Sequence, residues 1–106
     1  MASLHLTNYS AGVYQLSSSQ RTAIEHFVHT FEDTGLTFVV NGFSSSTADH
    51  ERNLALSTAR AAAVSELLVR LGVANDKIEQ RSFGERLFSG NAGDGQITQS
   101  VLIHAE

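Results

Sequence analysis

The sequence predicts an α/β fold of the α+β sandwich type, with elements in the order βαβαββ and two helices packed on one face of a small mixed sheet. The first observation is that strand-like and helix-like patterns alternate along the chain. The second is residues 36–41, a run rich in β-branched and aromatic residues between Gly35 and Gly42. The third is a long helical pattern that follows this run.

The first strand and the first helix each have a local signature. Residues 4–9 alternate apolar and polar side chains, which predicts a half-buried strand. Ser17 and Gln20 have the spacing of a capping box at the start of a helix, and Gly35 suits the left-handed position just beyond its end. The core-facing side chains recur three, four and seven residues apart: Ile24, Phe27, Val28 and Phe31.

The second half of the chain supplies the remaining elements. Residues 36–41 should form a central strand, and Asp49 should cap a second helix that runs to about Leu71, before Gly72. A turn is expected at residue 75 or 76. Apolar and polar side chains alternate weakly over residues 77–83, which predicts a third strand. Residues 90–95 predict a flexible loop, and residues 96–104 a last strand with one apolar face: Ile97, Val101 and Ile103.

The second helix places polar residues on its core-facing side. Asn53, Ser57 and Arg60 fall on one helical stripe, which the apolar Val64, Leu67 and Leu71 continue. A buried arginine needs an anion or buried acceptors. We therefore expect Arg60 to be at least half-buried and bound to carbonyl groups or an anion near residues 44–47. In the alternative, the helix start overshoots the core and Arg60 extends into water.

Composition limits the class of protein. With 106 residues and 42% hydrophobic content, the chain is long enough for one domain, and we expect residues 1–3 to be an artificial addition to it. The formal net charge is −4 and the seven basic residues are scattered, which argues against nucleic acid or an acidic membrane surface as the partner. The absence of cysteine excludes disulfides, thiol catalysis and cysteine zinc sites. No apolar run is long enough for a membrane span or a signal-peptide core.

Two clusters of side chains contain residue types found in catalytic or metal sites, but their arrangement is better explained otherwise. The serines at positions 44–46 lie near His50, but the Gly-x-Ser-x-Gly elbow of a serine nucleophile is absent, and a polar loop explains them better. His26 and His29 could form a weak metal site, although an exposed helix face is the simpler interpretation. The glycines near the end do not lie between a strand and a helix, so no nucleotide-binding loop is predicted. We expect neither catalysis nor a cofactor.

The chain resembles the OmpA-like C-terminal domain, found in outer-membrane proteins, peptidoglycan-associated lipoproteins and flagellar stator proteins. The resemblance rests on residues at matching intervals without gaps from Gly42 to Val73, and on further matches beyond. These residues are Gly42, Phe43, Ser44, Asn53, Leu56, Ser57, Arg60, Ala61, Val64, Leu71, Gly72, Val73, Ile78, Gly84 and Glu85. It implies a noncatalytic periplasmic domain that binds the diaminopimelate of peptidoglycan stem peptides. The implied pocket comprises Phe43, Ser44, Ser45, Asn53, Ser57 and Arg60.

Several positions depart from the family pattern. Ser45 stands where the family has an aspartate that binds the ligand's ammonium group, while the arginine partner is kept as Arg60. The family's Asn-Arg-Arg-Val signature aligns with residues 98–101, Thr-Gln-Ser-Val, which removes two arginines. Phe88 replaces an expected proline. In the family, the aspartate and the arginine together bind a ligand that carries both charges. Loss of one of these charge-assisted contacts weakens the binding free energy by roughly 1.5–3 kcal/mol.

Two functions remain open. The first is an envelope module whose peptidoglycan pocket has degenerated, and which acts as a structural or protein-interaction domain of a secretion system, a pilus or a similar assembly. Its apolar partner surface would comprise Phe43, Phe83, Leu87 and Phe88. The second is a domain that binds peptidoglycan noncovalently and anchors its parent protein to the cell wall. The lost charges favour the first, because they remove polar recognition while the core pattern is intact.

Overall fold

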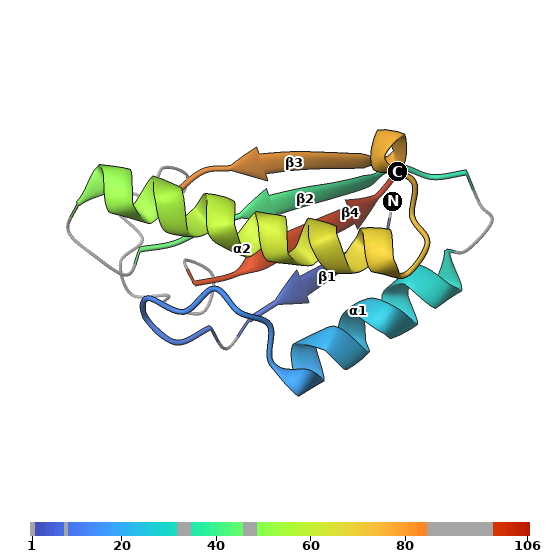
Figure 1. Ribbon diagram of the computed structural model, residues 1–106, viewed down its shortest axis with the longest axis horizontal. Helices are drawn as coiled ribbons and strands as arrows, with labels where there is room; N and C mark the ends of the chain where they lie inside the picture. Colours follow the sequence, from blue (N-terminus) through green and yellow to red (C-terminus); the bar gives the residue numbers. More distant parts are fainter. Residues whose placement is uncertain (1, 8, 32–34, 46–48, 85–98) are drawn as a thin grey trace.

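The computed structural model describes residues 2–7, 9–31, 35–45, 49–84 and 99–106, and these form an α/β sandwich. Two helices pack on one face of a four-stranded mixed sheet, as predicted (Figure 1). The elements are β1 (Ala2–Leu6), α1 (Ser18–Thr30), β2 (Phe38–Gly42), α2 (His50–Arg70), a 3₁₀ turn (Asn75–Lys77), β3 (Ile78–Ser82) and β4 (Val101–Ala105).

The strand order β1-β4-β2-β3 decides which chain segments meet. β4 runs antiparallel to both β1 and β2, whereas β3 runs parallel to β2. β2 is therefore central, as expected. The carboxyl ends of β2 and β3, the start of β4 and the start of α2 all lie at one end of the molecule (Figure 1). The candidate site residues come from these segments.

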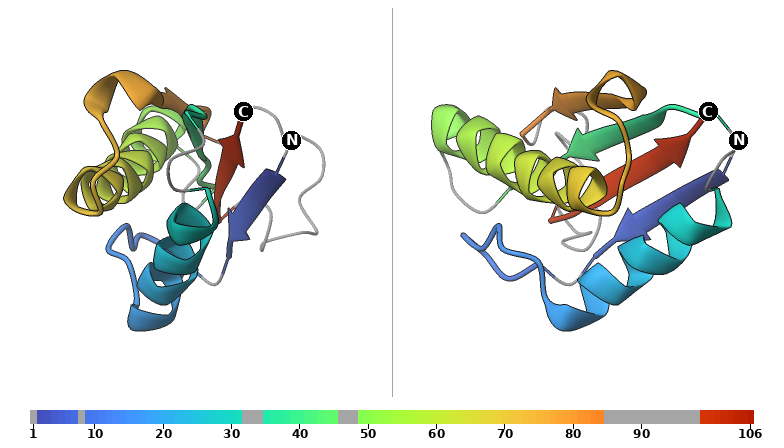
Figure 2. Two further views of the ribbon diagram at one scale, coloured as in Figure 1. Left: turned by 90° about the vertical axis from the view of Figure 1, so that its right-hand side faces the viewer. Right: turned by 45° about the vertical axis from the view of Figure 1, so that its right-hand side comes forward.

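The core lies between the sheet and the helices, and the two helices share the same side of the sheet (Figure 2). Its members with an exposed fraction of 0% are Ile24 from α1, Ala61, Val64 and Leu68 from α2, Val40 from β2, and Val101 and Ile103 from β4. The predicted stripe on α2 is right as far as Leu67, because Val64 is fully buried and Leu67 is partly buried against the core. Its expected end at Leu71 is wrong, because Leu68 continues the buried row while Leu71 is the C-cap residue and is 37% exposed.

Side-chain caps begin both helices as predicted. The capping box is complete, since the Ser17 hydroxyl accepts from the Gln20 amide and the Gln20 side chain accepts from the Ser17 amide. Gln20 also donates to the Thr7 carbonyl at 2.8 Å, which ties the start of α1 to the end of β1. Asp49 caps α2 by accepting from the amides of the first turn.

Several predicted boundaries are wrong. β1 is Ala2–Leu6 rather than residues 4–9, because its pairing with β4 ends at Leu6. α1 ends at Thr30, with Phe31 as its C-cap, so Gly35 does not cap it. Lys77 belongs to the 3₁₀ turn, so β3 begins at Ile78. β4 begins at Val101, where its pairing with the other strands begins. The predicted loop at 90–95 and the first residues of the predicted last strand, 96–98, lie outside the described residues.

Gly42 lets the end of β2 approach α2 closely. A Cβ atom at this position would lie 2.1 Å from the Ser57 carbonyl oxygen and 3.2 Å from the Ala61 Cβ. Both neighbours belong to α2, so only a residue without a side chain allows this separation of helix and strand.

Gly42→Ala should destabilise the protein by about 1–3 kcal/mol or more, because the new methyl group meets helix backbone that has no room to move. The measurement is the free energy of unfolding from denaturant titration. Gly12→Ala is the matched control, since Gly12 has a φ of 76° and nothing within 4 Å of an added Cβ, so it tests backbone strain alone, at about 1 kcal/mol. Equal losses in the two variants would contradict the close-approach argument.

Candidate functional site

Arg60 is the centre of the candidate site, and its exposed fraction is 0%. The guanidinium donates four hydrogen bonds to residues that the structure describes. Nε donates to the Val13 carbonyl at 2.7 Å, and Nη2 to the Ser10 carbonyl at 3.1 Å. Nη1 donates to the Phe43 carbonyl at 3.0 Å and to Oε1 of Gln99 at 2.7 Å. The expectation of a buried arginine bound to carbonyl groups is confirmed, and extension into water is excluded. The expected location near residues 44–47 fits only the Phe43 carbonyl and is wrong for the other described acceptors, which belong to residues 10, 13 and 99.

Tyr9 covers the guanidinium, with Cζ of Arg60 4.7 Å from the ring centroid. This is a cation–π contact in a desolvated setting, which stabilises the charged form of the arginine. Burial raises the pKa of Tyr9 to about 12, and the positive charge of Arg60 offsets part of that rise. Burial lowers the pKa of Arg60. At neutral pH the pair is a charged guanidinium under a neutral phenol.

The charge of Arg60 is held by dipoles. Within the described residues no carboxylate forms an ion pair with it, and three of its four acceptors are backbone carbonyls. Carbonyl dipoles aimed at a cation compensate for part of its lost hydration. The hydrogen bonds join α2 to the connection after β1, to Phe43 at the end of β2 and to Gln99, which precedes β4. Arg60 thus acts as a clamp between four segments.

Ser57 and Asn53 also lie at this end of α2 and are buried. The Ser57 hydroxyl donates to the Leu54 carbonyl at 2.8 Å and accepts from the Gly84 amide at 3.0 Å. Asn53 is 1% exposed, and its backbone amide donates to the Asp49 carbonyl. The polar side chain of Ser57 therefore connects α2 to the segment that follows β3.

The segment after β2 is attached to its neighbours on both sides. The Phe43 amide donates to the Ser100 carbonyl and the Ser44 amide to the Gly84 carbonyl, each at 3.0 Å. The Phe43 ring stacks on Phe83, with centroids 5.3 Å apart. Phe43 and Ser44 are buried, whereas Ser45 is partly exposed.

The structure thus brings together five of the six predicted site residues as buried parts of one end of the fold, and Ser45 alone of the six keeps exposed surface. Sequence reasoning missed the residues that bind Arg60 from the connection after β1: Tyr9, Ser10 and Val13. Tyr9 was assigned to a strand, and carbonyl groups carry no side-chain signal. Gln99 was noted only as a departure from the family pattern.

The rival sites gain no support. Ser44 is fully buried and His50 is exposed at the start of α2, an arrangement that does not suit a nucleophile and its base. His26 and His29 are exposed on α1, as the simpler interpretation predicted. No group of three or more potential metal ligands occurs among the described residues. Of the proposed apolar partner surface, Phe43 and Phe83 stack on each other, and Leu87 and Phe88 lie outside the described residues.

The family model described as the OmpA family matches residues 8–97. The chain belongs to the OmpA family. The OmpA-like domain of FopA1 from Francisella tularensis subsp. tularensis SCHU S4 is similar in structure and 25% identical in sequence. The superposition has a TM-score of 0.82 and covers 95% of this chain and 69% of that one.

Two further solved structures share the fold at lower identity. The peptidoglycan-associated lipoprotein from Burkholderia pseudomallei is 20% identical, with a TM-score of 0.80 over 96% of this chain and 89% of that one. The C-terminal domain of Helicobacter pylori MotB is 17% identical, with a TM-score of 0.79 over 96% and 83%. No curated protein sequence matches the chain. No helix in the part of the chain that the structure describes is long and apolar enough to cross a membrane.

Arg60→Leu should lower the free energy of unfolding by about 2–4 kcal/mol, because the buried Phe43 carbonyl and the Gln99 amide lose their donor. Chemical denaturation followed by circular dichroism measures this. Arg52→Leu is the control on the same helix, since the Arg52 side chain is 77% exposed, and it should change stability by no more than about 0.5 kcal/mol. A neutral Arg60→Leu would instead mean that the arginine is a vestige without a structural role.

Stability should fall as the pH rises through the range from 10 to about 12 because of Tyr9. The unfolded tyrosine loses its proton near its ordinary pKa of 10.0, whereas the folded one keeps it to about 12, so alkali favours the unfolded state. The contribution is complete below pH 10. Unfolding free energies of wild type and Tyr9→Phe across this window test it, and parallel curves would contradict it.

Proposed function

We propose that the chain is a noncatalytic cell-envelope module whose peptidoglycan pocket has degenerated. In this role it acts as a structural or protein-interaction domain of an envelope assembly, such as a secretion system or a pilus. Membership of the OmpA family supports the envelope context. The likeness to the periplasmic domain of MotB and to a peptidoglycan-associated lipoprotein supports a periplasmic location at the cell wall.

The observation that carries the proposal is the burial of Arg60. A residue that binds a ligand's carboxylate must present N–H groups to it, whereas this guanidinium has an exposed fraction of 0% and gives four N–H donors to the protein. Gln99 strengthens the argument, because its neutral amide oxygen occupies Nη1 at 2.7 Å. A ligand carboxylate would have to displace these acceptors.

The second candidate is noncovalent binding of peptidoglycan stem peptides through diaminopimelate. It is favoured by the extent of the family match and by the partial exposure of Ser45, which follows β2 at the end of the molecule where Arg60 lies. In this version the domain anchors its parent protein to the wall with low affinity. The two candidates differ in one observable property, which is binding to purified peptidoglycan.

Wild-type protein should fail to co-sediment with purified peptidoglycan, because Ser45 supplies no charge for the ammonium group of diaminopimelate. Ser45→Asp restores that charge near the amino end of α2, where the helix dipole favours an anion. It should gain measurable binding through the ammonium group alone, while Arg60 keeps its acceptors within the protein. That contact is worth roughly 1.5–3 kcal/mol, or about ten- to a hundredfold in affinity. The neutral Ser45→Asn is the matched control and should not bind.

Each other outcome has a defined meaning. Wild-type binding as tight as that of Ser45→Asp would contradict the degenerate-pocket proposal and establish the wall-binding alternative. Binding by neither protein would contradict the role given to Ser45 and leave Gln99 and Ser100, where the family has arginines, as the positions that close the pocket.

A further inference from the structure

The outer edge of β3 has no partner strand among the described residues, since β3 is the last strand in the order β1-β4-β2-β3. The Phe83 amide donates to the Gly42 carbonyl, which fixes the direction of the backbone groups along β3. Residues 79 and 81 share the direction of Phe83 and bond to β2. Ile78, Gln80 and Ser82 therefore direct their N–H and C=O groups away from the sheet.

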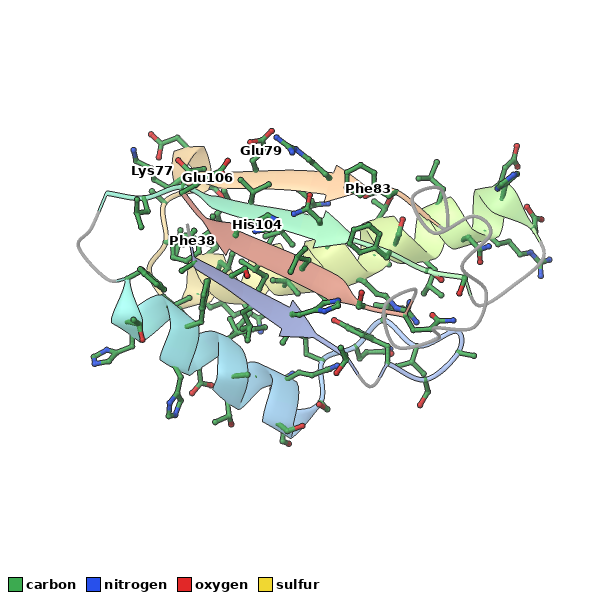
Figure 3. The ribbon with its side chains drawn as sticks, turned by 180° about the vertical axis from the view of Figure 1, so that it is seen from behind. Phe38, Lys77, Glu79, Phe83, His104 and Glu106 are labelled. Carbon is green, nitrogen blue, oxygen red and sulfur yellow. The ribbon has the colours of Figure 1, made fainter. Side chains whose placement is uncertain are left out.

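The charged side chains of β3 alternate in sign around Gln80. Glu79 lies on the sheet face opposite the helices (Figure 3), and Arg81, two residues on along the strand, shares that face. Their side chains are 51% and 49% exposed and form an ion pair of 2.8 Å. A twofold axis through Gln80 would place Glu79 of one copy opposite Arg81 of the other, and Arg81 opposite Glu79. The edge is thus complementary in charge to itself when two copies run antiparallel.

We propose that β3 is a self-association edge, where the strand pairs antiparallel with β3 of a second copy and joins the two sheets. The backbone geometry fits this register. Gln80 would exchange both hydrogen bonds with Gln80 of the second copy, and Ile78 would do the same with Ser82. These are the residues whose polar backbone groups face outward, so the pairing leaves the ladder between β2 and β3 intact.

A groove beside the edge provides apolar surface for the same contact. It has a volume of about 510 Å³ between α2 and β3, and its apolar walls include Ala62, Val69 and Ile78. Val69 is 43% exposed, which is high for a large aliphatic residue. Glu66 and Arg70 also line the groove and carry opposite charges, so two grooves brought together add no net charge.

Charged side chains on an edge strand often prevent it from pairing with another chain. The arrangement of the charges on β3 therefore decides whether they hinder or favour pairing with a second copy. Protective charges of one sign repel every copy. Here the two signs alternate, and antiparallel pairing about Gln80 is the register that places each of the two charges opposite its complement. A partner of different sequence would have no reason to match this symmetry.

Sedimentation equilibrium of the 106-residue chain, at concentrations up to about 1 mM, tests the proposal. Wild type should form dimers. Glu79→Arg alone and Arg81→Glu alone should each weaken dimerisation about tenfold or more, because like charges then face each other across the axis. An equimolar mixture of the two variants should restore dimers, since each arginine of one chain then faces a glutamate of the other.

Both variants lose the ion pair between residues 79 and 81 of the same chain. Dimers that form only in the mixture must therefore come from charge pairing between the two copies. Gln80→Pro removes an outward N–H without breaking the ladder to β2 and should also abolish dimers, whereas Gln80→Ala should not. Circular dichroism confirms that each variant folds. A wild type that is monomeric throughout, dimers that tolerate both single charge changes, or a mixture that stays monomeric would each overturn the proposal.

Discussion

The burial of one guanidinium organises the end of the molecule where the candidate site lies. Arg60 carries a full charge into a place with no exposed surface, and this requires compensation from every direction. Carbonyl groups from the connection after β1 and from the end of β2 supply it, together with Gln99 and the ring of Tyr9. The exposed connection after β1, residues 10–15, is thereby fixed to α2.

Other features at this end serve the same arrangement. Gly42 permits β2 to approach the backbone of α2, and the Ser57 hydroxyl receives the amide of Gly84. The polar stripe of α2 is thus a structural interface along its whole length, and it passes into the apolar core at Val64 and Leu68. The structure gives these polar residues roles in packing.

Much of the architecture could be predicted from the sequence because periodicity and caps are local signals. The capping box at Ser17 and the cap at Asp49 follow from adjacent residues alone. So does the central strand, although it was predicted at residues 36–41 and is Phe38–Gly42. The polar stripe of α2 predicted a buried Arg60 for the same reason. Its acceptors could not be predicted, because Ser10 and Val13 act through carbonyl groups some fifty residues away in the chain. Strand ends were missed because pairing partners decide them.

The central claim is that four of the five N–H groups of Arg60, Nε–H among them, bind acceptors within the protein itself. The most direct test is heteronuclear NMR of the Arg60 Nε–H group during titration with a soluble muropeptide that contains diaminopimelate. The account predicts a resonance protected from exchange with water and unmoved by the muropeptide, while that of exposed Arg52 exchanges rapidly. A saturable shift of the Arg60 resonance on titration would contradict it, because the guanidinium would then bind the ligand.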